Sequence, residues 1–164
     1  MLWLVKKTLT TGANVNLFKS AVVCLVVVAI CGCDRAQPRP PNQFIAVKIL
    51  ADRGDAEAQC NLGTIYQNGQ NTTRDDVEAV KWYRRAAQQG NSEAQFNLGD
   101  MYANGDGIQQ NAVEAYAWFF AAATGGNGDA AFYRDDLADK LTADQVSAGQ
   151  KRAAELLQRY GAGK

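Results

Sequence analysis

Polar side chains recur on one side of two predicted helices, at positions where they could bind a ligand. At 100° per residue, Asn61, Thr64 and Asn68 share a stripe of roughly 60° with Glu57. Thirty-six residues later the same positions hold Glu93, Asn97, Asp100 and Asn104, and the pattern continues through Asp129, Tyr133 and Asp136. Amides and carboxylates suit a peptide backbone or a basic segment. The stripe therefore predicts a surface for a protein or peptide partner, with plain solvation of an outer helix face as the alternative.

Residues for catalysis or metal binding are few. The sequence has no histidine, which is the commonest general acid/base and metal ligand, and no S-x-x-K motif or Gly-rich phosphate loop. The paired acids at 75–76 and 135–136 point about 100° apart on a helix, which favours solvated caps over an acid/base pair. Cys31, Cys33 and Cys60 do not complete a four-ligand zinc site. We expect no catalytic residue, no metal and no cofactor.

The elements that carry the stripe belong to an internal repeat with a period of 36 residues. The first copy contains, in order, Ala58, Leu62-Gly63, Tyr66, Gly69, Ala79, Trp82-Tyr83, Ala86-Ala87 and Gly90. Each of these has a counterpart of the same kind in the second copy, from Ala94 to Gly126, including Gly99 and Trp118-Phe119. A period in the range of about 20 to 50 residues indicates stacked helical or strand units that bury their apolar faces against one another.

These positions resemble the Sel-one-like repeat, a helical relative of the tetratricopeptide repeat. The second copy fits with Gly105-Asp106-Gly107-Ile108 in its inter-helix loop, whereas the first has Asn71 and Thr72 there, so a less regular turn is expected. The resemblance implies an all-α, right-handed solenoid of helix-turn-helix units with about seven helices. It also implies a protein-binding scaffold. Some members of the family have been linked to penicillin binding or β-lactam hydrolysis, but they resemble disulfide-bridged repeats, and this chain lacks a cysteine pair in each repeat.

The solenoid is expected to cover residues 43–160. Its two full repeats should span about 55–90 and 91–126, and capping helices should lie within 43–53 and 128–160. The third unit keeps Ala130-Ala131 but has Arg134 in place of the repeat's leucine, as suits a terminal unit with a polar outer face. Thr142 and Gln145 form a capping-box pattern for the last helix.

The N-terminus predicts export. Residues 1–20 contain three lysines and no acid, and Ala21 to Cys31 form an apolar run of eleven residues, which is typical of a signal peptide over 1–32 and short for a membrane span. Ile30-Cys31-Gly32-Cys33 resembles a bacterial lipobox, which implies lipid on Cys33 and membrane attachment. Asp34 after that cysteine implies retention at the inner membrane, facing the periplasm. An ordinary thiol at the end of a membrane helix is the alternative.

Residues 33–42 should form a linker, because Pro38, Pro40 and Pro41 are all the prolines of the chain. Without the leader the net charge would be about −3, which gives no basic footprint for nucleic acid. Cys60 shares a repeat position with Phe96 and is expected to be a small buried apolar residue. The sequence thus predicts a lipid-anchored envelope scaffold, with an envelope enzyme or a secreted host-interaction factor as alternatives.

Lipidation of Cys33 can be tested directly. Labelled palmitate is expected to enter the wild-type protein and not Cys33→Ser, because only the thiolate of that residue would accept the lipid. Gel fluorography of the immunoprecipitated proteins measures this. Equal labelling of both proteins would exclude Cys33 as the attachment site.

Overall fold

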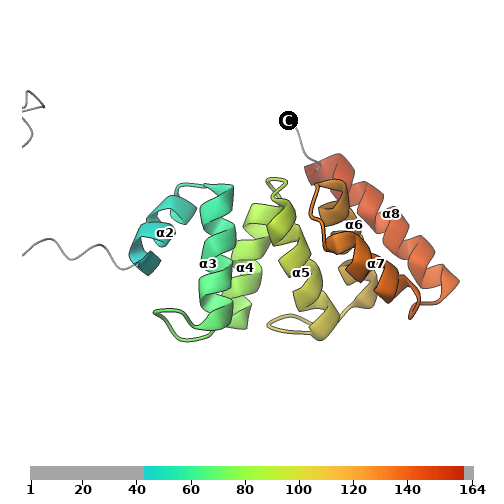
Figure 1. The fold of residues 1–164 in the computed structure, drawn as a ribbon, viewed down its shortest axis with the longest axis horizontal. Coiled ribbons are helices and arrows are strands. Elements are labelled where there is room, and N and C mark those ends of the chain that lie inside the picture. The colour runs from blue at the N-terminus through green and yellow to red at the C-terminus, as the bar shows by residue number, and fades with distance from the viewer. Residues whose placement is uncertain (1–42, 161–164) are drawn as a thin grey trace, which may run out of the picture. The chain divides into compact units, whose positions relative to one another are not determined.

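The computed structural model describes residues 43–160, and this part of the chain is entirely helical. Its helices are α2 (Gln43–Asp52), α3 (Ala56–Asn68), α4 (Asp76–Ala87), α5 (Ser92–Asn104), α6 (Ala112–Thr124), α7 (Ala130–Ala138) and α8 (Ala143–Tyr160). Successive helices from α2 to α7 pack side by side in chain order (Figure 1). The prediction of an all-α solenoid with about seven helices is confirmed. The predicted signal peptide (1–32) and linker (33–42) lie outside the described residues.

Each helix of the two repeats begins at a capping side chain. Asp55, Asp75, Asn91 and Asn111 accept hydrogen bonds from backbone N–H groups two or three residues later, at 2.7 to 3.1 Å. These caps satisfy N–H groups that have no partner within the helix. The recurrence of Asp or Asn at 36-residue spacing therefore sets where the helices start.

Both repeats close through an aromatic ring that lies on a glycine. A Cβ atom built on Gly63 would stand 2.7 Å from the Tyr83 ring, and one built on Gly99 would stand 2.8 Å from the Phe119 ring. These distances are too short for any side chain, so Gly63 and Gly99 allow the close contact between the two helices. Each glycine costs about 1 kcal/mol in helix propensity relative to alanine, and the close helix contact offsets this cost.

Successive repeats are joined by a buried glutamine that the sequence reasoning missed. Gln59 Nε2 donates to the Ala51 carbonyl at the end of α2 (3.1 Å), and Gln95 Nε2 donates to the Ala87 carbonyl at the end of α4 (3.2 Å). Each bond satisfies a C-terminal carbonyl of the preceding helix. The sequence did contain a signal for this contact, because glutamine occupies the same repeat position in both copies.

The core consists of the small and aromatic residues of the repeat. Trp82 and Trp118, the tryptophans of the two repeats, are both buried. Cys60 is also buried, and burial raises the pKa of its thiol to about 12. The interpretation of Cys60 as a small buried apolar residue is therefore confirmed.

The inter-helix loops of the two repeats are more alike than expected. Asn71 and Gly107 occupy the same repeat position and have nearly the same left-handed backbone, with φ of 60° and 65°. Gly107 must be glycine, because a Cβ there would stand 2.3 Å from the backbone of Asp76. Asn71 replaces it because asparagine tolerates the left-handed region. The expectation of a less regular first turn was wrong for this reason.

The last helix leaves the repeat pattern. α8 packs against α6 rather than forming a hairpin with α7. A Cβ on Gly149 would stand 2.6 Å from the Tyr116 ring, and Arg152 Nε donates to Glu114 Oε1 at 2.8 Å. The predicted capping box is present, with Thr142 Oγ1 accepting from Gln145 N and Gln145 Oε1 accepting from Thr142 N. None of the helices described here is long and apolar enough to cross a bilayer.

The buried tryptophans offer a test of the core. Trp118→Ala is expected to lower the free energy of unfolding by about 3 to 5 kcal/mol, because it removes a large buried ring. Phe132→Ala is the matched control, since Phe132 is 71% exposed and its loss should change stability by under about 0.5 kcal/mol. Urea denaturation followed by circular dichroism measures both. A loss below about 1 kcal/mol for Trp118→Ala would contradict the core assignment.

Candidate interaction surface

The six residues predicted to bind a partner divide into two groups. Asn61, Asn68 and Asn104 are exposed, as a binding role requires. Thr64, Asn97 and Asp100 are half-buried. We call these six positions on α3 and α5 the A-helix face. Its half-buried members contact other side chains of the protein: Thr64 contacts Tyr83, Asn97 contacts Cys60, and Asp100 accepts a hydrogen bond from Asn104.

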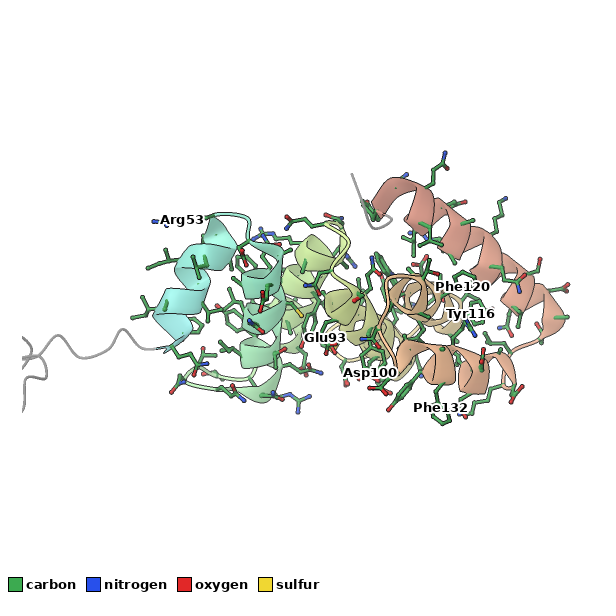
Figure 2. All side chains as sticks on the ribbon, turned by 45° about the horizontal axis from the view of Figure 1, so that its top comes forward. Arg53, Glu93, Asp100, Tyr116, Phe120 and Phe132 are labelled. Carbon is green, nitrogen blue, oxygen red and sulfur yellow. The ribbon has the colours of Figure 1, made fainter. Side chains whose placement is uncertain are left out.

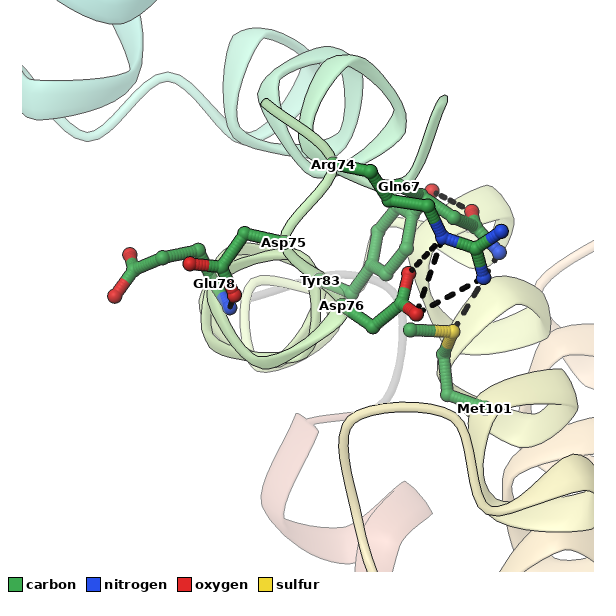
Figure 3. A network of polar contacts seen from close by, with 7 residues as sticks. All are labelled: Gln67, Arg74, Asp75, Asp76, Glu78, Tyr83 and Met101. Atoms are coloured by element: carbon green, nitrogen blue, oxygen red, sulfur yellow. Dashed lines mark hydrogen bonds and ion pairs between the residues drawn. The ribbon is translucent and has the colours of Figure 1, made fainter. Parts of the chain in front are cut away.

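Thr64 belongs to a hydrogen-bonded chain that crosses from α3 to α5. Its Oγ1 lies 3.1 Å from the Tyr83 hydroxyl, which donates to Gln67 Oε1 at 2.7 Å. Gln67 Nε2 in turn points at Met101 Sδ on α5, 3.5 Å away (Figure 3). Burial is the main reason that the pKa of Tyr83 is raised to about 12. Thr64 therefore positions the Tyr83 ring, a role that the stripe pattern did not predict.

Asn97 lies over the thiol of the preceding repeat. Its Nδ2 is 4.0 Å from Cys60 Sγ, so the side chain bridges α5 and α3 rather than pointing straight into solvent. The sequence could not reveal this contact, because it depends on how far one repeat is rotated against the next. Asn97 consequently supports stacking as well as lining the surface.

Asp100 is the most unusual residue of the surface. It occupies the repeat position of Thr64, but the ring beneath it is Phe119, which has no hydroxyl to offer. Partial burial raises the pKa of its carboxyl, and a hydrogen bond from Asn104 opposes that shift. No ion pair with a residue in 43–160 involves Asp100. The site thus retains a partly desolvated carboxylate without a cation.

Charge is distributed unevenly between the helices. α3 and α5 contain Glu57, Glu93 and Asp100 but neither lysine nor arginine. By contrast, α4 contains Lys81, Arg84 and Arg85, and α8 contains Lys151, Arg152 and Arg159. α3 and α5 therefore carry a net negative charge although the chain as a whole is close to neutral.

A separate hollow lies at the loop between α5 and α6. It has a volume of about 370 Å³ and is lined by Tyr102, Ile108, Gln109, Gln110, Asn111, Glu114 and Arg152. Three of its lining residues are already engaged, because Arg152 pairs with Glu114 and Gln110 Nε2 donates to the Ala103 carbonyl at 2.7 Å. The sequence reasoning did not identify this hollow, since α8 contributes to it from outside the repeat.

Within residues 43–160, no group of three or more histidine, cysteine, aspartate or glutamate side chains could hold a metal ion. Cys60 is also unsuited to act as a nucleophile, because its buried thiol stays protonated near neutral pH. The chemistry that the described surface supports is recognition by hydrogen bonds and charge.

Comparisons with known proteins agree with this architecture. The Sel1 repeat model matches residues 56–91 and 92–127. Comparison with curated protein sequences found no match.

Solved structures give a longer similarity. One is a protective antigen present in uropathogenic Escherichia coli strains that displays an SLR fold; it is 32% identical, with a TM-score of 0.70 over 72% of this chain and 26% of that one. Another is a Sel1 repeat protein from Oxalobacter formigenes, 35% identical, with a TM-score of 0.56 over 57% of this chain and 27% of that one. The chain therefore matches about a quarter of each of these longer proteins. Residues 56–127 thus match the Sel1 repeat twice, and the described chain is an all-helical solenoid similar to these SLR-fold structures.

Proposed function

We propose that this protein is a lipid-anchored scaffold of the bacterial cell envelope that holds a protein partner on its A-helix face. Sel1 repeats are interaction modules, and nothing in the geometry of residues 43–160 suggests a reaction instead. The observation that carries the proposal is that Asn61, Asn68 and Asn104 are exposed although the same helices bury Leu62 and Leu98 completely. These amides are not needed for the core and are accessible to a partner, although Asn104 also donates a hydrogen bond to Asp100.

Membrane attachment through Cys33 and a location facing the periplasm belong to the same proposal. They are supported by the lysine-containing leader, the apolar run of eleven residues and the lipobox-like Ile30-Cys31-Gly32-Cys33, with Asp34 favouring the inner membrane. A partner would then be a protein of the envelope. Nucleic acid is a poor candidate because α3 and α5 carry acidic side chains and no basic ones.

Site-specific photo-crosslinking in cells tests the proposed face. Benzoylphenylalanine placed at Asn61 or Asn104 is expected to form a discrete crosslinked band, because both side chains are exposed on the A-helix face. Lys81 on α4 and Gln88 directly after α4 are matched control positions, because both are exposed. Immunoblotting with identification of the crosslinked protein measures the result. Equal crosslinking at the control positions would contradict binding at this face.

A further inference from the structure

We call α3, α5 and α7, the first helices of the successive units, the A helices. A side chain of each later A helix lies over one defined position of the A helix before it. Asn97 on α5 covers Cys60 on α3, with 4.0 Å between Nδ2 and Sγ. Tyr133 on α7 covers Phe96 on α5, with ring centroids 5.2 Å apart at 77°. Both pairs are separated by 37 residues. The stacking of the solenoid therefore repeats as a ladder of contacts between neighbouring A helices.

The next position of this ladder is Phe132, and no element of the described chain covers it. Its repeat counterparts become progressively less protected: Cys60 is buried, Phe96 is half-buried and Phe132 is 71% exposed. The cause is the departure of α8, which packs on α6 and leaves the outer side of α7 open. Phe132 is the most exposed of the large apolar side chains described.

The exposed ring is the outer end of an aromatic series that starts in the core. Phe119 is buried and lies 5.6 Å from Phe96 between centroids. Tyr133 lies 5.7 Å from both Phe119 and Phe132. Rings held in this way lose little conformational freedom when a partner docks, which makes aromatic side chains common anchors of protein interfaces.

Carboxylates flank these rings. On α5, Glu93 lies three residues before Phe96 and Asp100 lies four residues after it. Asp129, directly before α7, lies three residues before Phe132. At these spacings each carboxylate shares a helix side with the ring. No ion pair inside the described region involves Glu93, Asp100 or Asp129. Figure 2 shows Glu93, Asp100 and Phe132 on the side of the molecule away from α8.

The cations of α7 are already engaged elsewhere. Arg134 pairs with Asp135 at 2.7 Å, and its guanidinium lies 5.5 Å from the Phe120 ring of α6. Lys140, just beyond the helix, pairs with Asp136 at 2.5 Å. Neither of these two cations neutralises Glu93, Asp100 or Asp129, so these carboxylates can attract the positive charge of a partner.

We propose that Glu93, Phe96, Asp100, Asp129, Phe132 and Tyr133 form an acidic aromatic surface that binds an arginine-containing apolar segment of a partner protein. An apolar side chain of that segment takes the uncovered ladder position over Phe132. Its guanidinium groups pair with the carboxylates and stack on the rings, which an ammonium does less well. This assignment rests on the protein-binding function proposed above and adds the chemistry of the partner.

Defined peptides test the proposal without knowledge of the natural partner. The probe is a fluorescein-labelled peptide of alternating leucine and arginine, and its binding to the purified full chain is measured by fluorescence anisotropy. Alternating serine–arginine and leucine–glutamate peptides of equal length separate charge from apolar contact. The leucine–arginine peptide is expected to bind at least about tenfold more tightly than the serine–arginine peptide, and the leucine–glutamate peptide is expected not to bind.

Variants locate the site. Phe132→Ser and Asp100→Asn are each expected to weaken binding of the leucine–arginine peptide by about tenfold or more. Ile49→Ser and Asp144→Asn are the matched controls, because they remove an exposed apolar side chain on α2 and an exposed carboxylate on α8. They should bind the peptide as the wild type does. Equal losses in the controls, or no loss in the two site variants, would overturn the proposal.

The melting temperature provides a second readout for Asp100. An acid whose pKa is raised in the fold binds its proton more tightly there than in the unfolded chain, so its ionised form at pH 7 costs stability. Asp100→Asn should therefore keep or raise the melting temperature at pH 7 while binding falls. A fall in both would mean that Asp100 is structural and would overturn its role in binding.

The competing occupant is a second copy of this chain. Light scattering of the wild type and of Phe132→Ser distinguishes it: a mass that falls to the monomer only in the variant would assign the surface to self-association and overturn the proposal. Failure of photo-crosslinking at Asn61 and Asn104, with peptide binding retained, would instead reject the A-helix face as the partner site in cells and leave the acidic aromatic surface standing.

Discussion

The contact between an aromatic ring and a glycine on the facing helix is the constraint on which the rest of the structure depends. Tyr83 lies on Gly63, and Phe119 lies on Gly99, so each repeat closes with its helices as near as a ring allows. Close packing at protein-interior density makes this contact intolerant of any added side chain. Once the two helices of each repeat are fixed, the buried glutamines can join one repeat to the next.

This packing also decides what remains outside. The alanine, leucine and tryptophan side chains of the repeat are buried in the core, so the amides and carboxylates of α3 and α5 lie on the opposite side of these helices. The face is not uniform, however. The Tyr83 hydroxyl lies within hydrogen-bonding distance of Thr64 Oγ1, whereas the Phe119 ring has no hydroxyl that could bond to Asp100. The repeats differ at two paired positions, Thr64 with Tyr83 and Asp100 with Phe119, so one position holds a structural residue and the other a partly desolvated carboxylate with no ion pair within residues 43–160.

The same ring-on-glycine contact explains the departure at the end of the solenoid. Gly149 receives the ring of Tyr116, and this contact, together with the pairing of Arg152 and Glu114, holds α8 on α6. As a result, Phe132 on α7 is left exposed. In a continuing stack, another A helix would cover this apolar position. The packing of α8 on α6 therefore has two consequences: it stabilises the contact between these helices, and it leaves Phe132 exposed.

The sequence alone determined the all-helical repeat architecture, because caps, glycines and small residues act over a few residues and recur at 36-residue spacing. It also identified Asn61, Asn68 and Asn104 as outward-facing. Tertiary structure decided the rest. The position of α8 depends on which of two helices offers the better surface, and the contact of Asn97 with Cys60 depends on the rotation between repeats. Such relations join residues that no local pattern links, which is why the open Phe132 and the unpaired Asp100 emerged only from the folded chain.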